Sequence, residues 1–226
     1  MSHALVSNGC LMDATRQKLI ETAGQLFSRD GFESTTVREI CQHAGTNVAS
    51  IHYHFGDKER LYIEAVKHAH CHQPPSPQPW AEGATPPQKL AAIIHQMMTV
   101  MLDAETPSWH TELMMRELAR PTSACEALVR EFIDPLFAQL LCVVTELLPP
   151  SVPLVERQGL AFSVVAQCLL YRYHRPIGRL LVGENHFQQL TTIEESARRI
   201  TEFSLGGLQS VATREGAVAS KPGESS

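Results

Sequence analysis

The chain has 226 residues, of which 43% are apolar, and its formal net charge at pH 7 is −5. This apolar fraction excludes a disordered chain, and no apolar run approaches the roughly 20 residues of a membrane-spanning helix. The six cysteines stand singly, which is typical of reduced thiols in a cytoplasmic protein rather than of a disulfide framework. The first 72 residues hold seven Lys/Arg against eight Asp/Glu, so charge alone does not indicate a nucleic-acid-binding protein.

Helical periodicity runs along the whole chain without a strand or hairpin pattern, so the sequence predicts an all-α fold. We expect Asp13 to cap a first helix that ends before Gly31. Thr36 and Glu39 form a capping box that opens a short second helix, and Gly45 ends it.

Another short helix is expected to begin at Asn47 and to end at Gly56, after which Asp57 caps a fourth helix. Two short helices joined by a tight, glycine-containing turn are typical of a helix-turn-helix, whose second helix lies in the major groove of DNA. The third helix can bury Ile51 and Phe55, and its other positions are small, polar or aromatic but never acidic. The pattern therefore predicts a DNA-binding helix-turn-helix over about residues 35–58.

Six prolines between residues 73 and 87 interrupt the helical pattern and separate two halves of the chain. We place an N-terminal three-helix DNA-binding domain at 13–72 and a C-terminal helical dimerisation and ligand-sensing bundle at 86–211. Helices are expected in the second half at about 88–104, 108–120, 123–148, 154–175 and 190–211, with a kink or break at Pro135. The last dozen or so residues have the composition of a frayed tail.

The last two expected helices are apolar on more than one face, which predicts that they form the interface of a homodimer. In the first of them, the residues that indicate this are Leu160, Phe162, Val164, Val165, Cys168, Leu169 and Tyr171. In the second they are Ile200, Phe203, Leu205 and Leu208. Coverage by the core of the same subunit is the alternative.

Three segments carry a family resemblance: LFSRDGF at 26–32, TTVREI at 35–40 and SIHYHFGDKERL at 50–61. Together they closely resemble the TetR family of one-component transcriptional repressors over roughly residues 13–70. The segments NVASI at 47–51 and ELARPT at 117–122 are similar to its CecR-like branch. The resemblance implies a homodimer that binds double-stranded operator DNA and is released by a small-molecule inducer, which the sequence does not identify.

Carried over residue by residue, the resemblance implies DNA contacts by two groups of residues. Outside the recognition helix these are Thr36 and Arg38, and Lys58, where positive charge and a helix N-terminus favour phosphate. The positions of the recognition helix are Asn47, Val48, Ser50, His52, Tyr53 and His54. Members of the family most often have tyrosine where this chain has His52. A half-buried structural role is the alternative for Tyr53.

A methionine-rich stretch in the second half suits a loosely selective small-molecule pocket, because methionine adapts to varied shapes. We expect the pocket to involve His95, Met98, Met101, Trp109, His110, Met114 and Arg116. Ordinary core packing is the alternative for each of them.

His68, His70, Cys71 and His72 crowd the end of the fourth expected helix, and His68 and His72 stand four apart on one face, a spacing that can ligate zinc. Imidazoles near a helix C-terminus also interact favourably with the helix dipole, so we expect no metal and no cofactor. The chain contains no catalytic motif, and we do not expect an enzyme. Two alternatives remain: a regulator controlled by a partner protein instead of a small molecule, and a helical enzyme or carrier.

Overall fold

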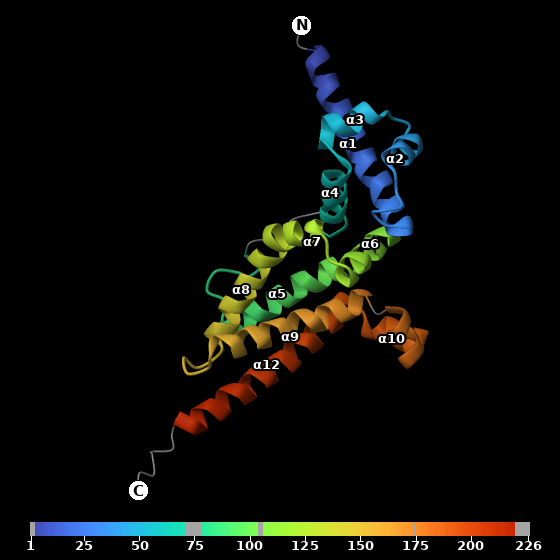
Figure 1. Cartoon of the computed structure of the whole chain (residues 1–226). Coiled ribbons are helices and arrows are strands. Elements are labelled where there is room, and N and C mark those ends of the chain that lie inside the picture. Colours follow the sequence, from blue (N-terminus) through green and yellow to red (C-terminus); the bar gives the residue numbers. More distant parts are fainter. Residues whose placement is uncertain (1–2, 71–77, 104–105, 174, 220–226) are drawn as a thin grey trace. The chain divides into compact units, whose positions relative to one another are not determined.

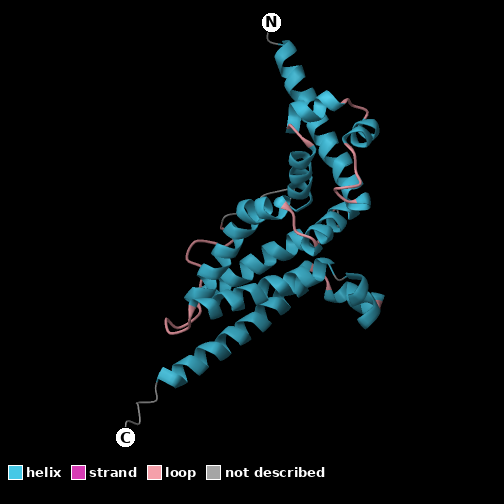
Figure 2. Cartoon of the chain, viewed as in Figure 1, coloured by secondary structure: helices cyan, strands magenta, loops and turns pink. Residues whose placement is uncertain are grey.

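The computed structural model describes residues 3–70, 78–103, 106–173 and 175–219, and every regular element within them is a helix (Figure 2). The prediction of an all-α fold is confirmed. None of the described helices is long and apolar enough to cross a membrane. The chain divides into two compact units (Figure 1). Unit 1 combines α1–α4 with α6 and α7, whereas unit 2 combines α5 with α8–α12.

The core of unit 1 lies between α1, α4 and α6, which pack against one another. Its helices are α1 (His3–Asp30), α2 (Val37–Ala44), α3 (Val48–Phe55), α4 (Lys58–His70), α6 (Ser108–Ala119) and α7 (Ser123–Leu128). The expected apolar faces of α1 and α4 are buried, including Leu19, Phe27 and Leu61. The start of α1 differs from the expectation. The helix begins at His3 and carries Asp13 inside it, because no proline separates 3–13 from the rest.

Residues 106–132, which were predicted to belong to the C-terminal bundle, pack in unit 1. The reason is the burial of Trp109, Leu113 and Met114 on the inner face of α6, which contacts α1 and α4. Gly24 makes room for this contact, since a Cβ placed there would lie 2.1 Å from the Trp109 ring. The structural unit that contains the helix-turn-helix is therefore not one continuous segment, because it also includes α6 and α7 from later in the chain.

Buried Glu117 joins three helices of unit 1. Its carboxylate accepts hydrogen bonds from the Tyr62 hydroxyl of α4 at 2.7 Å and from the backbone N–H groups of Thr122 at 2.6 Å and Cys125 at 3.0 Å. Burial and the adjacent carboxylate raise the pKa of Tyr62 above its ordinary value. The neighbouring Arg116 donates to the carbonyl oxygens of Ser28 and Arg29 at the end of α1, at 2.6 and 2.7 Å.

Unit 2 has its core between four helices, with two further short helices at one end. The elements are α5 (Pro86–Met101), α8 (Asp134–Glu146), α9 (Leu154–Tyr173), α10 (Arg175–Val182), α11 (Glu184–Leu190) and α12 (Ile193–Ala219). Buried residues of α5, α8, α9 and α12, such as Ile94, Val144 and Cys168, form one cluster. A π-helical turn at Val129–Ile133 precedes α8, so the break expected at Pro135 is confirmed, and the proline lies in the first turn of α8.

The sequence analysis did not predict α10 and α11, and α12 extends beyond the expected end at 211. Pro176, Gly178 and Gly183 disfavour a helix when the sequence alone is considered. Pro176 is tolerated, however, because it lies in the first turn of α10, where its missing N–H has no helical partner. Gly183 has φ +81° and separates α10 from α11.

We predict that Glu117→Ala lowers the free energy of unfolding of unit 1 by about 2–4 kcal/mol, because several donors lose their acceptor in a buried site. Tyr62→Phe removes one of these bonds and should cost about 1–2 kcal/mol. The chain has two tryptophans, so urea unfolding can be followed by Trp109 fluorescence in a Trp80→Phe background.

Glu126→Ala on the exposed face of α7 is the matched control and should change the free energy of unfolding by less than about 0.5 kcal/mol. If Glu117→Ala is no more destabilising than this control, the carboxylate does not hold the three helices together.

The cysteines are predicted to differ in reactivity. Burial raises the pKa of the Cys168 thiol to about 12, whereas Cys142 is exposed on α8. At pH 8 the folded chain should therefore be alkylated by iodoacetamide at Cys142 and protected at Cys168, since the thiolate is the reactive form. Peptide mass spectrometry measures both sites. Equal labelling of the two in the folded state would contradict the packing of α9, and urea-unfolded protein is the positive control.

Candidate nucleic-acid interface

The turn between α2 and α3 is closed by backbone hydrogen bonds. Thr36 caps α2, because its hydroxyl oxygen accepts from the Glu39 N–H at 3.2 Å. This is one half of the expected capping box, and the Glu39 carboxylate lies 3.6 Å from the Arg29 guanidinium. Gly45 ends the helix with φ +62°, a left-handed conformation that favours glycine. The Thr46 N–H then donates to the Cys41 carbonyl at 2.9 Å.

Both ends of the eight-residue helix α3 are capped. At its start the Asn47 side-chain oxygen accepts from the Ser50 N–H at 3.0 Å. At its end Gly56, with φ +86°, donates its N–H to the carbonyls of Ile51 and His52. The His52 ring nitrogen Nδ1 lies 2.6 Å from the Gly56 carbonyl oxygen, so it carries the proton that this contact needs. These contacts determine the residues at which α3 begins and ends.

Helix α3 is docked by two buried side chains; Ser50 and His54 are half-buried, and its other residues are exposed. Ile51 is fully buried and Phe55 is buried below the Arg16 guanidinium, which lies 5.3 Å from its ring centroid. Tyr53, in contrast, is 69% exposed, which argues against the half-buried alternative. Its ring meets that of His54 edge to face at 5.0 Å. The resulting outer face carries no carboxylate, and it leaves the Asn47 amide group available as a donor.

Residues before and after α3 extend this surface. Thr36, the N-cap of α2, and Arg38 in its first turn are exposed. Lys58 begins α4, and its ammonium lies 4.3 Å from the centroid of the Phe32 ring. The expected phosphate site at this helix start is partly occupied by the protein itself, because the Asp57 carboxylate accepts from the Arg60 N–H at 2.8 Å. What this helix start still offers is chiefly the charge of Lys58.

Two cations that the sequence analysis did not select lie close to these turns. The Lys18 ammonium would be 3.7 Å from a Cβ added at Gly45, and the Arg60 guanidinium would be 3.4 Å from one added at Gly56. Lys18 lies on α1, distant in sequence from the turn, so no local motif could identify it. Arg60 lies within the segment 50–61 that carries the family resemblance, so its position two residues after Lys58 could have identified it.

The seven residues expected to line a ligand pocket divide between the two units. His95, Met98 and Met101 lie on α5 in unit 2, whereas Trp109, His110, Met114 and Arg116 lie on α6 in unit 1. Met98, Trp109, His110 and Met114 are buried. Trp109 and His110 pack with His68, at ring-centroid distances of 6.1 and 5.4 Å. These contacts favour the core-packing alternative for Trp109 and His110.

Each unit has a hollow that includes one of the expected ligand residues. In unit 2, His95 lines a groove of about 550 Å³ between α5 and α12, together with Ala92, Ala197 and Thr201. In unit 1, Arg116 lines a cavity of about 580 Å³ together with Phe32, Tyr62, Arg120 and others. These volumes suit a small organic ligand.

The histidine cluster after α4 is only partly visible. His68 and His70 lie in the last turns of α4, and the His70 ring is 5.8 Å from that of Phe132. Cys71 and His72 lie outside the described residues. Among the described residues there is no group of three or more His, Cys, Asp or Glu that could hold a metal ion.

Two family models match the chain. Residues 19–65 match the model of the bacterial regulatory proteins of the TetR family. Residues 86–208 match the C-terminal domain of the HTH-type transcriptional dual regulator CecR. The second match covers more than half of the chain, and the two together span both units.

Individual proteins agree with these matches. The chain is 34% identical over 59 residues to the transcriptional repressor NicS of Pseudomonas putida, covering 26% of this chain and 28% of NicS. It is 27% identical over 140 residues to the dual regulator CecR of Shigella flexneri, covering 57% of this chain and 62% of CecR. The matched parts thus span less than two thirds of these relatives.

A solved structure shows the same fold at lower identity. The transcriptional regulator FadR from Bacillus subtilis, in complex with stearoyl-CoA, superimposes with a TM-score of 0.56 at 15% identity, covering 84% of this chain and 98% of FadR. The helix-turn-helix geometry and both family matches lead to one assignment: the chain belongs to the TetR family of bacterial transcriptional regulators, and its C-terminal domain is of the CecR type.

Proposed function

We propose that the chain is a transcriptional repressor that binds a two-fold operator as a homodimer and releases it when a small molecule binds. The observation that carries this proposal is the outer face of α3, which exposes Tyr53 and carries no carboxylate. The helix itself is capped at both ends. A helix presented in this way fits the major groove, where its N-terminal residues reach the base edges. Regulation, and not catalysis, is the proposed activity, with the bacterial cytoplasm as its place.

The proposed DNA contacts fall into two groups. Asn47, Val48, Ser50, His52, Tyr53 and His54 face the bases and the neighbouring backbone. Thr36, Arg38 and Lys58 contact phosphates, which set the register of the protein on the duplex without reading sequence. We add Lys18 to the second group, because it brings positive charge to the turn between α2 and α3. The proposed DNA-binding domain, 13–72, is supported by α6 and α7, and the part of the proposed bundle at 86–211 that belongs to unit 2 senses the ligand.

The homodimer is supported by the outward faces of α9 and α12. Val164, Cys168, Ile200 and Leu208 are buried within unit 2, but Phe162 and Phe203 are 66% and 74% exposed. Gly159, Gly206 and Gly207 have open space where a side chain would be, so another helix can approach closely. Large apolar side chains beside such flat positions are typical of a subunit interface.

A ligand is supported by the groove between α5 and α12, whose small apolar side chains are bordered by His95, Glu194, Arg198 and Glu202. FadR, which shares the fold, was solved with stearoyl-CoA. For this chain the ligand must bind one of two dimer conformations more tightly, by a few kcal/mol, in order to release DNA. Control by a partner protein is the second candidate, favoured by exposed Met115 and Leu118 on α6.

We predict that Asn47→Asp leaves the stability of the protein unchanged within about 0.5 kcal/mol, because aspartate caps a helix as well as asparagine does. Operator affinity should nevertheless fall more than about tenfold, because the variant loses an amide donor and adds a negative charge beside DNA. Thermal unfolding and fluorescence anisotropy measure the two effects. Asn47→Ser, which keeps a neutral cap, is the control for charge. Unchanged operator affinity in Asn47→Asp would remove Asn47 from the interface.

Substitution of Tyr53 and Lys58 tests the proposed function most broadly. With DNA from upstream of the chain's own gene, Tyr53→Ala should weaken binding by about tenfold or more. Lys58→Ala should lower the slope of log affinity against log salt by about one unit, since one phosphate contact is lost. Mobility shift and anisotropy titrations measure both.

Lys89→Ala removes the same charge from unit 2, where Lys89 pairs with Glu146 at 2.7 Å, and is the matched control. It should leave DNA binding unchanged. If the wild-type protein binds no DNA at low salt although it is folded and dimeric, the proposed function is wrong. If either variant unfolds the protein, that residue is structural.

A further inference from the structure

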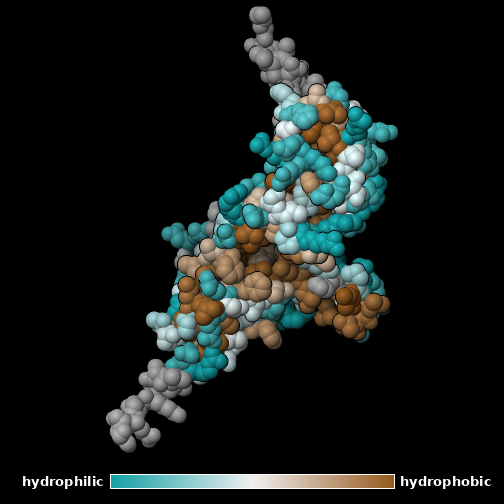
Figure 3. All heavy atoms as spheres, in the orientation of Figure 1, coloured by the Kyte–Doolittle hydropathy of each residue, from teal (hydrophilic) through white to brown (hydrophobic). Residues whose placement is uncertain are grey.

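Helix α10 presents its apolar side to solvent. Ile177, Leu180 and Leu181 lie at positions i, i+3 and i+4, which place them on one face, and they are 54%, 87% and 78% exposed. Figure 3 shows the apolar surface that gathers over α10, at the right edge of the view. We call these three residues the α10 ridge. Exposed leucines are ordinary when they are scattered singly, but a contiguous apolar ridge indicates an interaction site.

The outward direction of the ridge is fixed by the other side of the helix. A Cβ placed at Gly178 would lie 2.3 Å from the Phe187 ring, so only glycine lets α10 and α11 approach this closely. The Arg179 side chain reaches back to Glu184 of α11 at 3.2 Å and lies 5.9 Å from the Phe187 ring centroid. Helix α10 cannot turn its leucines inward without losing these contacts.

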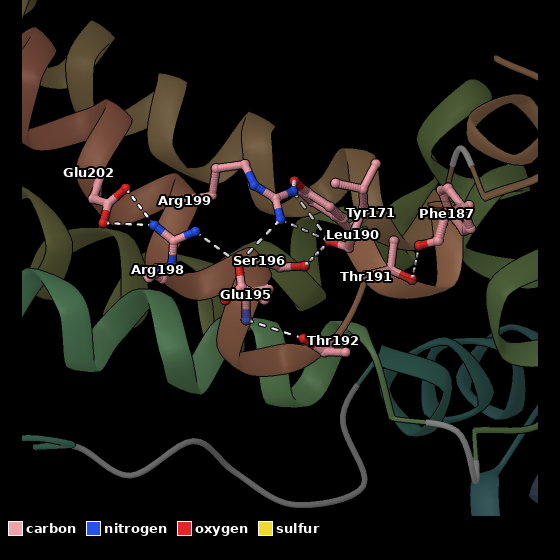
Figure 4. A network of polar contacts seen from close by, with 10 residues as sticks. All are labelled: Tyr171, Phe187, Leu190, Thr191, Thr192, Glu195, Ser196, Arg198, Arg199 and Glu202. Atoms are coloured by element: carbon pink, nitrogen blue, oxygen red, sulfur yellow. Dashed lines mark hydrogen bonds and ion pairs between the residues drawn. The ribbon is translucent and has the colours of Figure 1, made fainter. Parts of the chain in front are cut away.

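The helical pair α10–α11 is in turn held on the rest of unit 2 by a polar network (Figure 4). Arg199 of α12 donates to the Leu190 carbonyl at the end of α11 and to the Tyr171 hydroxyl of α9, both at 3.3 Å. Buried Ser196 donates to the same Leu190 carbonyl at 3.1 Å. The ridge is therefore presented on a defined support between α9 and α12.

We propose that the α10 ridge docks on a second copy of this chain and extends the homodimer interface beyond α9 and α12. This inference rests on the proposed homodimer. Its support is continuity: α10 follows α9 directly along the chain, and α9 already exposes Phe162 in its middle and Leu170 near its end. In a two-fold interface every patch occurs twice, so each copy offers one ridge and receives the other.

The area that an interface needs favours the same occupant. A stable homodimer buries on the order of 800 Å² or more from each partner. The outward faces of α9 and α12 offer two exposed phenylalanines beside three glycines, and the ridge adds three large aliphatic side chains to them. A membrane surface fits less well, because α10 has eight residues and its Arg179 is engaged by Glu184.

The test compares dimer dissociation constants of the full chain by sedimentation velocity. Leu180→Gln/Leu181→Gln should weaken the dimer at least about tenfold, because buried leucines at an interface become polar. Met115→Gln/Leu118→Gln removes two exposed apolar side chains from unit 1 and is the matched control, which should dimerise as the wild type does. Circular dichroism checks the fold. Independently of any variant, amide hydrogen exchange over residues 175–190 should slow as the wild-type chain dimerises.

The outcomes separate the two proposals. A wild-type chain that stays monomeric contradicts the proposed homodimer and the docking of the ridge with it. A wild-type dimer whose dissociation constant is unchanged by Leu180→Gln/Leu181→Gln, with no slowing of exchange over 175–190, overturns the role of the ridge alone. Loss of binding to phosphatidylglycerol vesicles in that variant, with an unchanged dimer, assigns the ridge to a membrane and also overturns it.

Discussion

The docking of two side chains, Ile51 and Phe55, is the constraint on which the DNA-binding surface depends. A helix of eight residues is too short to be stable alone in water, so α3 exists because these residues are buried against its neighbours. Once they are fixed, helical geometry determines which side chains face outward. Tyr53 is exposed because Ile51 and Phe55, two positions to either side, are not. The caps at Asn47 and Gly56 then determine where the helix that carries this face begins and ends.

The core that receives Ile51 and Phe55 is supported by residues far away in the sequence. Helix α6 packs on α1 and α4, and its neighbouring residues Arg116 and Glu117 bind the end of α1 and the middle of α4. Buried carboxylates are costly without partners, and Glu117 accepts from several donors. The unit that presents α3 therefore includes a segment that follows α5, and a change in α6 reaches α1 and α4 through these bonds.

Local signals predicted the local structure well. Gly31, Gly45 and Gly56 end their helices as expected because each adopts a positive φ that other residues avoid. The buried faces of α1 and α4 followed from helical spacing. The predicted start of α1 was wrong, because a capping residue such as Asp13 also fits inside a helix when no proline forces a break. Membership of α6 in unit 1 could not be predicted, since burial of Trp109 depends on which helix it meets.

The candidate sites show the same division between local and distant contacts. Positions of the recognition helix could be named from sequence because they lie in one segment with fixed spacing. Lys18 could not, since its approach to Gly45 depends on the packing of α1. Met98 and Met114 were grouped by residue type, but they lie in different units, because the chain passes from one unit to the other between α5 and α6. The α10 ridge could not be predicted, because proline and glycine disfavour a helix in the sequence, whereas in the structure they permit two short helices.

The central claim, that two copies of α3 read one operator, is tested most directly by hydroxyl-radical footprinting of the full chain on DNA from upstream of its own gene. We expect two protected blocks related by two-fold symmetry, with centres separated by a whole number of helical turns of about 10 base pairs, because both recognition helices enter the major groove from one side. A single asymmetric block, or binding by the folded dimer that protects no defined sequence, would contradict it.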